Sequence, residues 1–133
     1  MAKVLVAEDD SEMRRLVVEA LRRDGHDVTE APDGGWLFLR LAEAFHHDHG
    51  FSDLDCIVSD VRMPTCGGLE LLQRLVDICE IVPVILMTAF GDDELRGRTE
   101  TMGATLIEKP LSLDALRKAV WRLAGTRPRS RRA

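Results

Sequence analysis

Short apolar runs alternate with amphipathic segments along the chain, and this alternation constrains the fold more than any other feature of the sequence. The run Lys3–Ala7 is nearly unbroken, which is typical of a central parallel strand covered on both faces. The five predicted strands are Lys3–Ala7, His26–Ala31, Asp55–Ser59, Pro83–Met87 and Thr105–Ile107. Each is followed by a segment with helical character. This order predicts a single α/β domain, a three-layer sandwich in which helices cover both faces of a five-stranded parallel sheet.

The predicted helices differ in how much apolar surface they offer to the sheet. Apolar residues three and four positions apart mark four of them, Met13–Leu21, Leu37–Phe45, Leu69–Val76 and Leu113–Leu123. Asp33 and Ser112 are predicted N-caps of the second and the last helix. The fourth helix, Asp92–Met102, has few apolar residues, and Gly97 in its interior costs about 1 kcal/mol relative to alanine. We therefore expect the fourth helix to be the weakest element.

Length and charge distribution narrow the possible functions. A chain of 133 residues fits one domain, which we place at residues 1–124, and residues 125–133 are predicted to be a basic, disordered tail or the start of a linker. That end holds four arginines and no acid, which leaves 14 basic and 23 acidic residues on residues 1–124, a net charge of −9. A body this acidic binds nucleic acid poorly. Contact with nucleic acid is expected only through an output domain not present in this chain, or through the basic tail.

Nothing in the sequence predicts a membrane span or an export signal. No apolar run approaches the roughly 18 residues that a spanning helix needs. The chain enters a strand-like segment at Lys3, which leaves no room for a signal peptide, so a cytoplasmic location is expected. Cys56, Cys66 and Cys79 are too widely spaced for a zinc or redox motif and are interpreted as structural or incidental.

Chemically active side chains gather where the predicted strands end. Glu8, Asp9 and Asp10 follow the first strand, Asp60 the third, Thr88 and Ala89 the fourth, and Lys109 and Pro110 the fifth. In an open parallel sheet, ligands bind beyond the carboxyl ends of the strands. Apolar strands do not collect carboxylates at their ends for packing reasons. If the first and third strands are neighbours, a functional site is expected at this edge.

A cluster of Glu8, Asp9 and Asp60 would need a cation, because three carboxylates in one pocket repel one another. Mg²⁺ suits oxygen ligands of this kind, and one Mg²⁺ with the Lys109 ammonium balances the three negative charges. Such a pocket can accept a phosphoryl group, with Thr88 as a hydroxyl donor and a carboxylate as the nucleophile that forms an acyl phosphate. Asp10 is assigned to the start of the first helix rather than to the metal.

Four segments, VLVAEDD, VSDVRMP, LMTA and EKP, in this order and spacing, resemble the receiver domain of bacterial two-component response regulators. The resemblance covers Ala2–Leu123, nearly the whole chain. It implies a flavodoxin-like fold with strand order 2-1-3-4-5. It also implies a signalling domain, not an enzyme in the usual sense, that catalyses its own phosphorylation and dephosphorylation. The phosphoryl donor would be a sensor histidine kinase or a histidine phosphotransfer protein.

The resemblance assigns roles residue by residue. Asp60 would be the phosphoacceptor, and Glu8, Asp9, Asp60 and the backbone carbonyl of Arg62 would hold Mg²⁺. Thr88 and the Ala89 backbone N–H would bind phosphoryl oxygens, and Lys109 would bind the phosphoryl group and bridge to Asp60. The Lys109–Pro110 peptide bond is expected to be cis. Phosphorylation would switch the surface made by the fourth helix, the fifth strand and the fifth helix, through which members of the family often dimerise.

Several positions depart from the family pattern. Leu106 stands where an aromatic residue is usual, which predicts a muted or replaced aromatic switch. Glu8 replaces the more common aspartate, and Thr65-Cys66-Gly67-Gly68 changes the loop after the proline. The resemblance also implies that the residues two positions beyond Asp60 and Thr88 tune the lifetime of the phosphoryl group. Here they are Arg62 and Phe90, which are large enough to impede an attacking water and predict a longer-lived phosphoryl group than small residues would.

Other functions stay open at this point. A phosphorylation-independent interaction module would not need the full set of carboxylates with Thr88 and Lys109. A phosphohydrolase with an aspartyl phosphate would usually need a second aspartate where Arg62 stands.

A second metal site is suggested by the neighbouring residues His46, His47, Asp48 and His49, but they are interpreted as the solvated end of the second helix. Trp36 and Trp121 are interpreted as partly exposed packing residues. The sequence names no kinase, and it leaves open whether the chain is a stand-alone receiver or part of a longer regulator.

Overall fold

A computed structural model describes residues 2–46, 48, 50–51, 53–63, 66–77, 82–89 and 91–125. Its five strands are β1 (Lys3–Ala7), β2 (Asp27–Ala31), β3 (Cys56–Asp60), β4 (Val84–Thr88) and β5 (Thr105–Glu108). All pairings are parallel, and the strands lie in the order β2-β1-β3-β4-β5, so the predicted topology is confirmed. Within the described residues, no helix is both long and apolar enough to cross a bilayer.

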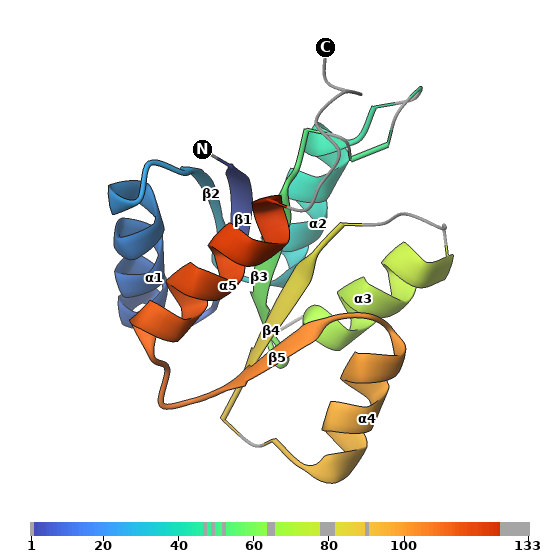
Figure 1. Ribbon diagram of the computed structural model, residues 1–133. Helices are drawn as coiled ribbons and strands as arrows, with labels where there is room; N and C mark the ends of the chain where they lie inside the picture. The colour runs from blue at the N-terminus through green and yellow to red at the C-terminus, as the bar shows by residue number, and fades with distance from the viewer. Residues whose placement is uncertain are drawn as a thin grey trace.

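Five helices alternate with the strands and form the outer layers (Figure 1). They are α1 (Ser11–Arg23), α2 (Gly34–Ala44), α3 (Gly68–Asp77), α4 (Asp93–Thr101) and α5 (Leu113–Gly125). Asp33 caps α2 by accepting the Trp36 N–H at 2.9 Å, and the Ser112 hydroxyl accepts the Ala115 N–H at 3.2 Å at the start of α5, as predicted. Asp10 caps α1 through the N–H groups of Glu12 and Met13, which confirms its place at the start of that helix.

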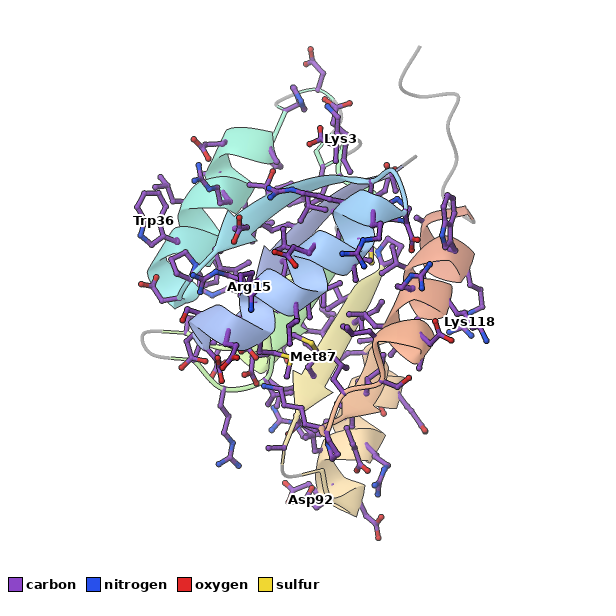
Figure 2. All side chains as sticks on the ribbon, turned by 90° about the vertical axis from the view of Figure 1, so that its left-hand side faces the viewer. Lys3, Arg15, Trp36, Met87, Asp92 and Lys118 are labelled. Carbon is purple, nitrogen blue, oxygen red and sulfur yellow. The ribbon has the colours of Figure 1, made fainter. Side chains whose placement is uncertain are left out.

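The sheet separates two hydrophobic cores, which explains why the central strands β1, β3 and β4 show no polar alternation. Val4 and Val6 of β1 pack into the core shared with α1 and α5, whereas Leu5 and Ala7 pack into the core on the other face, with α2 and α3. Because successive side chains of a strand point to opposite faces, a strand covered on both sides must be apolar throughout. Figure 2 shows Met87 inside the molecule, while Trp36 and Asp92 lie at its margin.

Some details of the predicted elements are wrong. Strands β3 and β4 each begin and end one residue later than predicted, so Asp60 and Thr88 belong to the strands themselves. The second helix ends at Ala44, and His46 forms an isolated bridge with Gly50 instead of standing on a helix.

The exposure of some helix residues also differs from the prediction. Leu16 and Val76, predicted on buried faces, are 39% and 46% exposed. Periodicity places a residue on a helix face but does not say how far that face is covered. Trp36 and Trp121 are partly exposed, as expected.

Candidate functional site

The strand order brings the predicted site residues to one edge of the sheet. β1 and β3 are neighbours with Ala7 opposite Ser59. Glu8, which follows β1, and Asp60, which ends β3, therefore lie next to each other. β3 pairs with β4, and Thr88 at the end of β4 pairs with Glu108. The carboxyl ends of these parallel strands therefore share one edge, although their residues are far apart in the chain.

Lys109 joins the two innermost carboxylates. Its Nζ donates to Glu8 Oε1 at 2.8 Å and to Asp60 Oδ2 at 3.0 Å, across sequence separations of 101 and 49 residues. The Lys109 backbone N–H donates to the Thr88 carbonyl at 2.7 Å, which ties the residue to the end of β4. The Lys109–Pro110 bond is cis, as the resemblance implied. The ammonium group is thus held between two acids, and the Lys109 side chain is one-fifth exposed.

Three carboxylates face one another at this edge. One oxygen each from Glu8, Asp9 and Asp60 lies within 4.8 Å of the others. Glu8 is fully buried and Asp60 is 8% exposed, whereas Asp9 lies in solvent. The cluster therefore consists of two buried carboxylates, Glu8 and Asp60, and a third, Asp9, on the side that is open to solvent.

The electrostatics of the cluster favour a cation. The pKa of Glu8 is raised to about 7, chiefly because the group is buried and also because of the adjacent Asp60 carboxyl, while the Lys109 ammonium acts in the opposite direction. Burial alone would lower the pKa of Lys109, but its bonds to Glu8 and Asp60 outweigh that effect and the pKa is raised. Glu8 Oε2 is buried without a hydrogen-bond partner among the described residues. An orphaned buried oxygen beside two further carboxylates fits a hard divalent ion with oxygen ligands.

The loop after β3 holds Asp60 from its other side. The Arg62 N–H donates to Asp60 Oδ1 at 3.3 Å, while the Arg62 side chain is exposed. Gly68 lies against this turn so closely that a Cβ would be 2.8 Å from the Asp60 carbonyl oxygen and 2.5 Å from Leu86 Cδ2. The altered sequence of this loop thus supplies a glycine where backbone packs directly on backbone.

The structure describes only some of the other predicted residues. Thr88 is 3% exposed at the end of β4, and Ala89 follows it in solvent. Phe90, His47, His49 and the arginines of the tail lie outside the described residues. His46 Nε2 lies 2.7 Å from the Asp53 carboxylate, apart from the carboxylate cluster.

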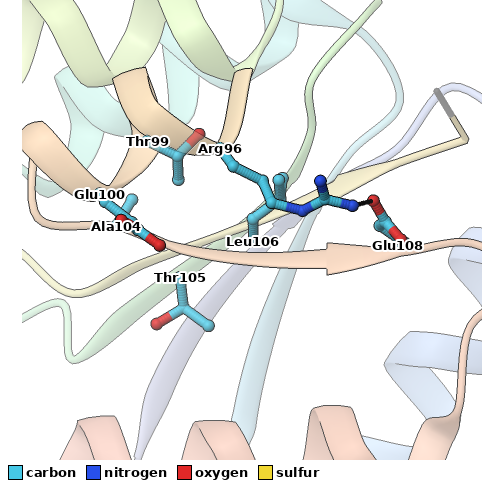
Figure 3. Close-up of a pocket in the computed structure, with 7 residues that line it drawn as sticks. All are labelled: Arg96, Thr99, Glu100, Ala104, Thr105, Leu106 and Glu108. Carbon is cyan, nitrogen blue, oxygen red and sulfur yellow. Dashed lines mark hydrogen bonds and ion pairs between the residues drawn. The ribbon is translucent and has the colours of Figure 1, made fainter. Parts of the chain in front are cut away.

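Leu106 faces a groove between α4 and β5 (Figure 3). The groove has a volume of about 430 Å³ and is lined by Arg96, Thr99, Glu100, Ala104, Thr105, Leu106 and Glu108. An ion pair between Arg96 and Glu108 joins the helix to the strand across it. The space beside α4 is therefore only partly filled by side chains.

One residue near the cluster, Arg14, was not predicted from the sequence. The Arg14 guanidinium donates to the Glu8 carbonyl oxygen at 2.8 Å and to Glu30 Oε1 at 3.3 Å. The sequence offers no signal for it, since Arg14 and Arg15 are adjacent arginines on the polar side of the same predicted helix.

Comparisons with known proteins agree with this arrangement. The family described as "Response regulator receiver domain" matches residues 4–121. The response regulator receiver protein CpdR of Brucella abortus is 30% identical over 114 residues, which cover 85% of this chain and 88% of that protein. Sporulation initiation phosphotransferase F of Bacillus subtilis is 29% identical over 119 residues, covering 89% and 90%. The solved receiver domain of a Francisella response regulator has a TM-score of 0.81 and 30% identity, and the match covers 94% of this chain and 98% of that one.

Proposed function

The chain belongs to the response regulator receiver domain family, and from that premise we propose that it accepts a phosphoryl group on Asp60 in a Mg²⁺-dependent reaction. The donor is a phosphohistidine of a sensor kinase or of a histidine phosphotransfer protein. The single observation that carries this proposal is the Lys109 ammonium held between Glu8 and Asp60, in contact with two of the three clustered carboxylates.

Asp60 is the nucleophile in this proposal. A carboxylate oxygen of Asp60 attacks phosphorus as the bond between phosphorus and the histidine nitrogen breaks, and the nitrogen keeps the electron pair and takes up a proton. The product is an acyl phosphate on Asp60. Asp60 is presented for this step because it ends β3, and the Arg62 N–H and Lys109 Nζ each bind one of its oxygens.

The other residues stabilise negative charge or bind the metal. Glu8, Asp9, Asp60 and the Arg62 carbonyl would hold Mg²⁺, which when bound neutralises charge on the phosphoryl oxygens. Lys109 would move from its ion pair with Asp60 to a phosphoryl oxygen. The Thr88 hydroxyl and the Ala89 N–H would donate to the other phosphoryl oxygens. Catalysis then rests on positioning and on electrostatics rather than on proton transfer.

Phosphorylation would control an output through the surface of α4, β5 and α5. Lys109 directly follows β5, and Thr88 pairs with Glu108, so a movement of either residue towards a phosphoryl group pulls on β5. With Leu106 in place of an aromatic residue, the Arg96–Glu108 ion pair is the contact that links this movement to α4. Formation of a homodimer through this surface is part of the same proposal.

Intact-protein mass after incubation with acetyl phosphate tests the proposal. We expect one added phosphoryl group in the wild type, dependent on Mg²⁺ and absent in Asp60→Asn. Asp77→Asn, which changes an exposed aspartate at the end of α3, should be labelled like the wild type. Labelling of Asp60→Asn would refute Asp60 as the acceptor, and no labelling of the wild type would favour an interaction module that works without phosphorylation.

A further inference from the structure

We propose that Arg14 is a positioning residue for the metal site, because it fixes the peptide group that joins Glu8 to Asp9. This inference rests on the proposed function, since it assumes that these two residues hold Mg²⁺. Arg14 itself has no part in the set of metal ligands. It acts through the backbone between two of them.

The contact falls on a particular peptide group. The Glu8 carbonyl that accepts from Arg14 Nη1 at 2.8 Å belongs to the peptide bond between Glu8 and Asp9. The preceding peptide group is held as well, because the Glu8 N–H donates to the Ala31 carbonyl at 3.1 Å. Both peptide planes that flank Glu8 are therefore oriented by hydrogen bonds, one from β2 and one from α1.

The guanidinium of Arg14 is itself held in place. Its Nε donates to Glu30 Oε1 at 3.3 Å, and the side chain is only 18% exposed. The Arg14 N–H donates to the carbonyl of the helix cap Asp10 at 2.9 Å, so the first turn of α1 fixes where the side chain starts. Glu30 is anchored in turn, since Arg40 Nε donates to its carbonyl at 3.3 Å. Arg14 thus connects a capped helix, an edge strand and the end of β1.

This geometry matters because Asp9 has little else to orient it. Its side chain lies in solvent at the open side of the cluster. Mg²⁺ requires nearly octahedral oxygen ligands, so a small rotation of the Glu8–Asp9 peptide would move one carboxylate away from the position that the metal needs. Partners that orient metal ligands typically change metal affinity by about 10- to 100-fold when they are removed.

The charge of Arg14 and its positioning role predict opposite effects. Arg14→Gln removes a positive charge beside three carboxylates. The loss of its Coulomb repulsion would by itself make Mg²⁺ bind more tightly. Loss of positioning would make it bind more weakly. The sign of the change in Mg²⁺ affinity therefore distinguishes the two explanations.

Arg15 provides a matched control. It is the neighbouring residue of α1, its side chain is 59% exposed, and it pairs with Glu19 on the same helix at 3.4 Å. Figure 2, in which α1 faces the viewer, labels Arg15 on the outer side of the helix. Arg15→Gln makes the same change in net charge without touching the Glu8 carbonyl. Arg14→Lys keeps the positive charge at position 14 and tests whether that charge is sufficient for the Mg²⁺ affinity of the wild type.

The experiment measures Mg²⁺ affinity by titration calorimetry at one ionic strength for the wild type and the three variants. We expect affinity to fall about 10-fold in Arg14→Gln, to recover partly in Arg14→Lys and to stay within about twofold in Arg15→Gln. Affinity that rises in Arg14→Gln, or that changes equally in both glutamine variants, would overturn the inference.

A metal-free readout separates the inference from the proposed function. The Asp9 amide resonance reports on the same peptide group whose carbonyl Arg14 binds, and it can be followed without Mg²⁺ in the ¹⁵N-labelled protein. We expect a clear shift in Arg14→Gln and none in Arg15→Gln. If the wild type binds no Mg²⁺ while this shift occurs, the proposed function fails and the contact stands. If the resonance is unmoved in Arg14→Gln, the positioning role fails whatever the metal does.

Discussion

Helices α4 and α5 both connect directly to β5, yet they are held to the molecule in very different ways. Of the residues of α5, Leu116 and Val120 are fully buried, and Ala119 and Ala124 are nearly so. In α4, all of whose residues are described, only Thr99 is buried. Figure 1 shows α5 lying beside α1 against the sheet, with α4 beyond β5 at the edge. One helix is part of a core, and the other rests on its margin.

The polar contacts follow the same division. Arg117 of α5 donates twice to the Asp24 carboxylate after α1, at 2.7 and 2.9 Å, and this contact lowers the pKa of Asp24. The Trp121 ring lies 4.6 Å from that of buried His26. Helix α4 has instead the half-exposed Arg96–Glu108 pair, and exposed pairs contribute roughly 0–1 kcal/mol.

This difference indicates which helix can move at a small cost in free energy. Moving α5 would expose a row of apolar side chains and break the two hydrogen bonds between Arg117 and the Asp24 carboxylate, whereas moving α4 would disturb one buried threonine and one half-exposed ion pair. If β5 is pulled by events at Asp60, α4 is the helix that can respond. Three measurements test this difference between the two helices.

The largest expected effect comes from deleting one leucine in each helix. Leu116→Ala in α5 removes a fully buried side chain, and we expect it to lower the free energy of unfolding by about 2–5 kcal/mol. Leu95→Ala in α4 removes a half-buried one and should cost about 1 kcal/mol. Denaturant unfolding of both variants checks this. Equal losses would show that α4 is packed as firmly as α5.

The second effect depends on pH and concerns His26 beneath α5. Burial lowers the pKa of His26 more than the nearby Asp24 carboxylate raises it. Its Nδ1 accepts the Ala2 N–H at 3.1 Å, and a protonated ring could not accept that bond. A lowered pKa in the folded state means that the unfolded chain takes up the proton first, so this group destabilises the fold as pH falls below about 6.5.

Glu8 works in the opposite direction, and the measurement must separate the two groups. Its pKa, raised to about 7, makes the folded state gain stability as pH falls from 7 towards the ordinary value of 4.5. The comparison is therefore between the wild type and His26→Asn, whose amide oxygen can accept the Ala2 N–H without titrating. We expect the free energy of unfolding of the wild type to fall relative to His26→Asn between pH 7 and pH 5. A constant difference over that range would contradict the prediction.

The smallest expected effect strengthens α4. Gly97 has open space where a Cβ would be, so Gly97→Ala should stabilise the helix by about 0.5–1 kcal/mol. Gly103, after α4, has the same open space but a φ of 79°, and Gly103→Ala should cost about 1–2 kcal/mol. Amide exchange across α4 and the free energy of unfolding measure both. If exchange in α4 does not slow in Gly97→Ala, backbone entropy is not what makes this helix weak.

Much of the fold was predictable because its signals are local. Apolar runs of strand length, helical spacing and caps such as Asp33 depend on residues close together in the chain, and the structure confirms them. The small buried surface of α4 was also predictable, since a helix with few apolar residues buries little surface in any arrangement. The exposure of Leu16 was not, because coverage of a helix face depends on what packs there.

Which reactive side chains stand at strand ends follows from the local sequence, because strand length and polarity set where each strand stops. How these residues meet depends instead on the packing of segments that are distant in the chain. The contacts of Lys109 with Glu8 and Asp60 depend on β1 lying beside β3, and the contact of Arg14 with the Glu8 carbonyl depends on the angle at which α1 leaves β1. Hydrogen bonds demand positions correct to a few tenths of an ångström, and packing sets such positions where a sequence pattern cannot.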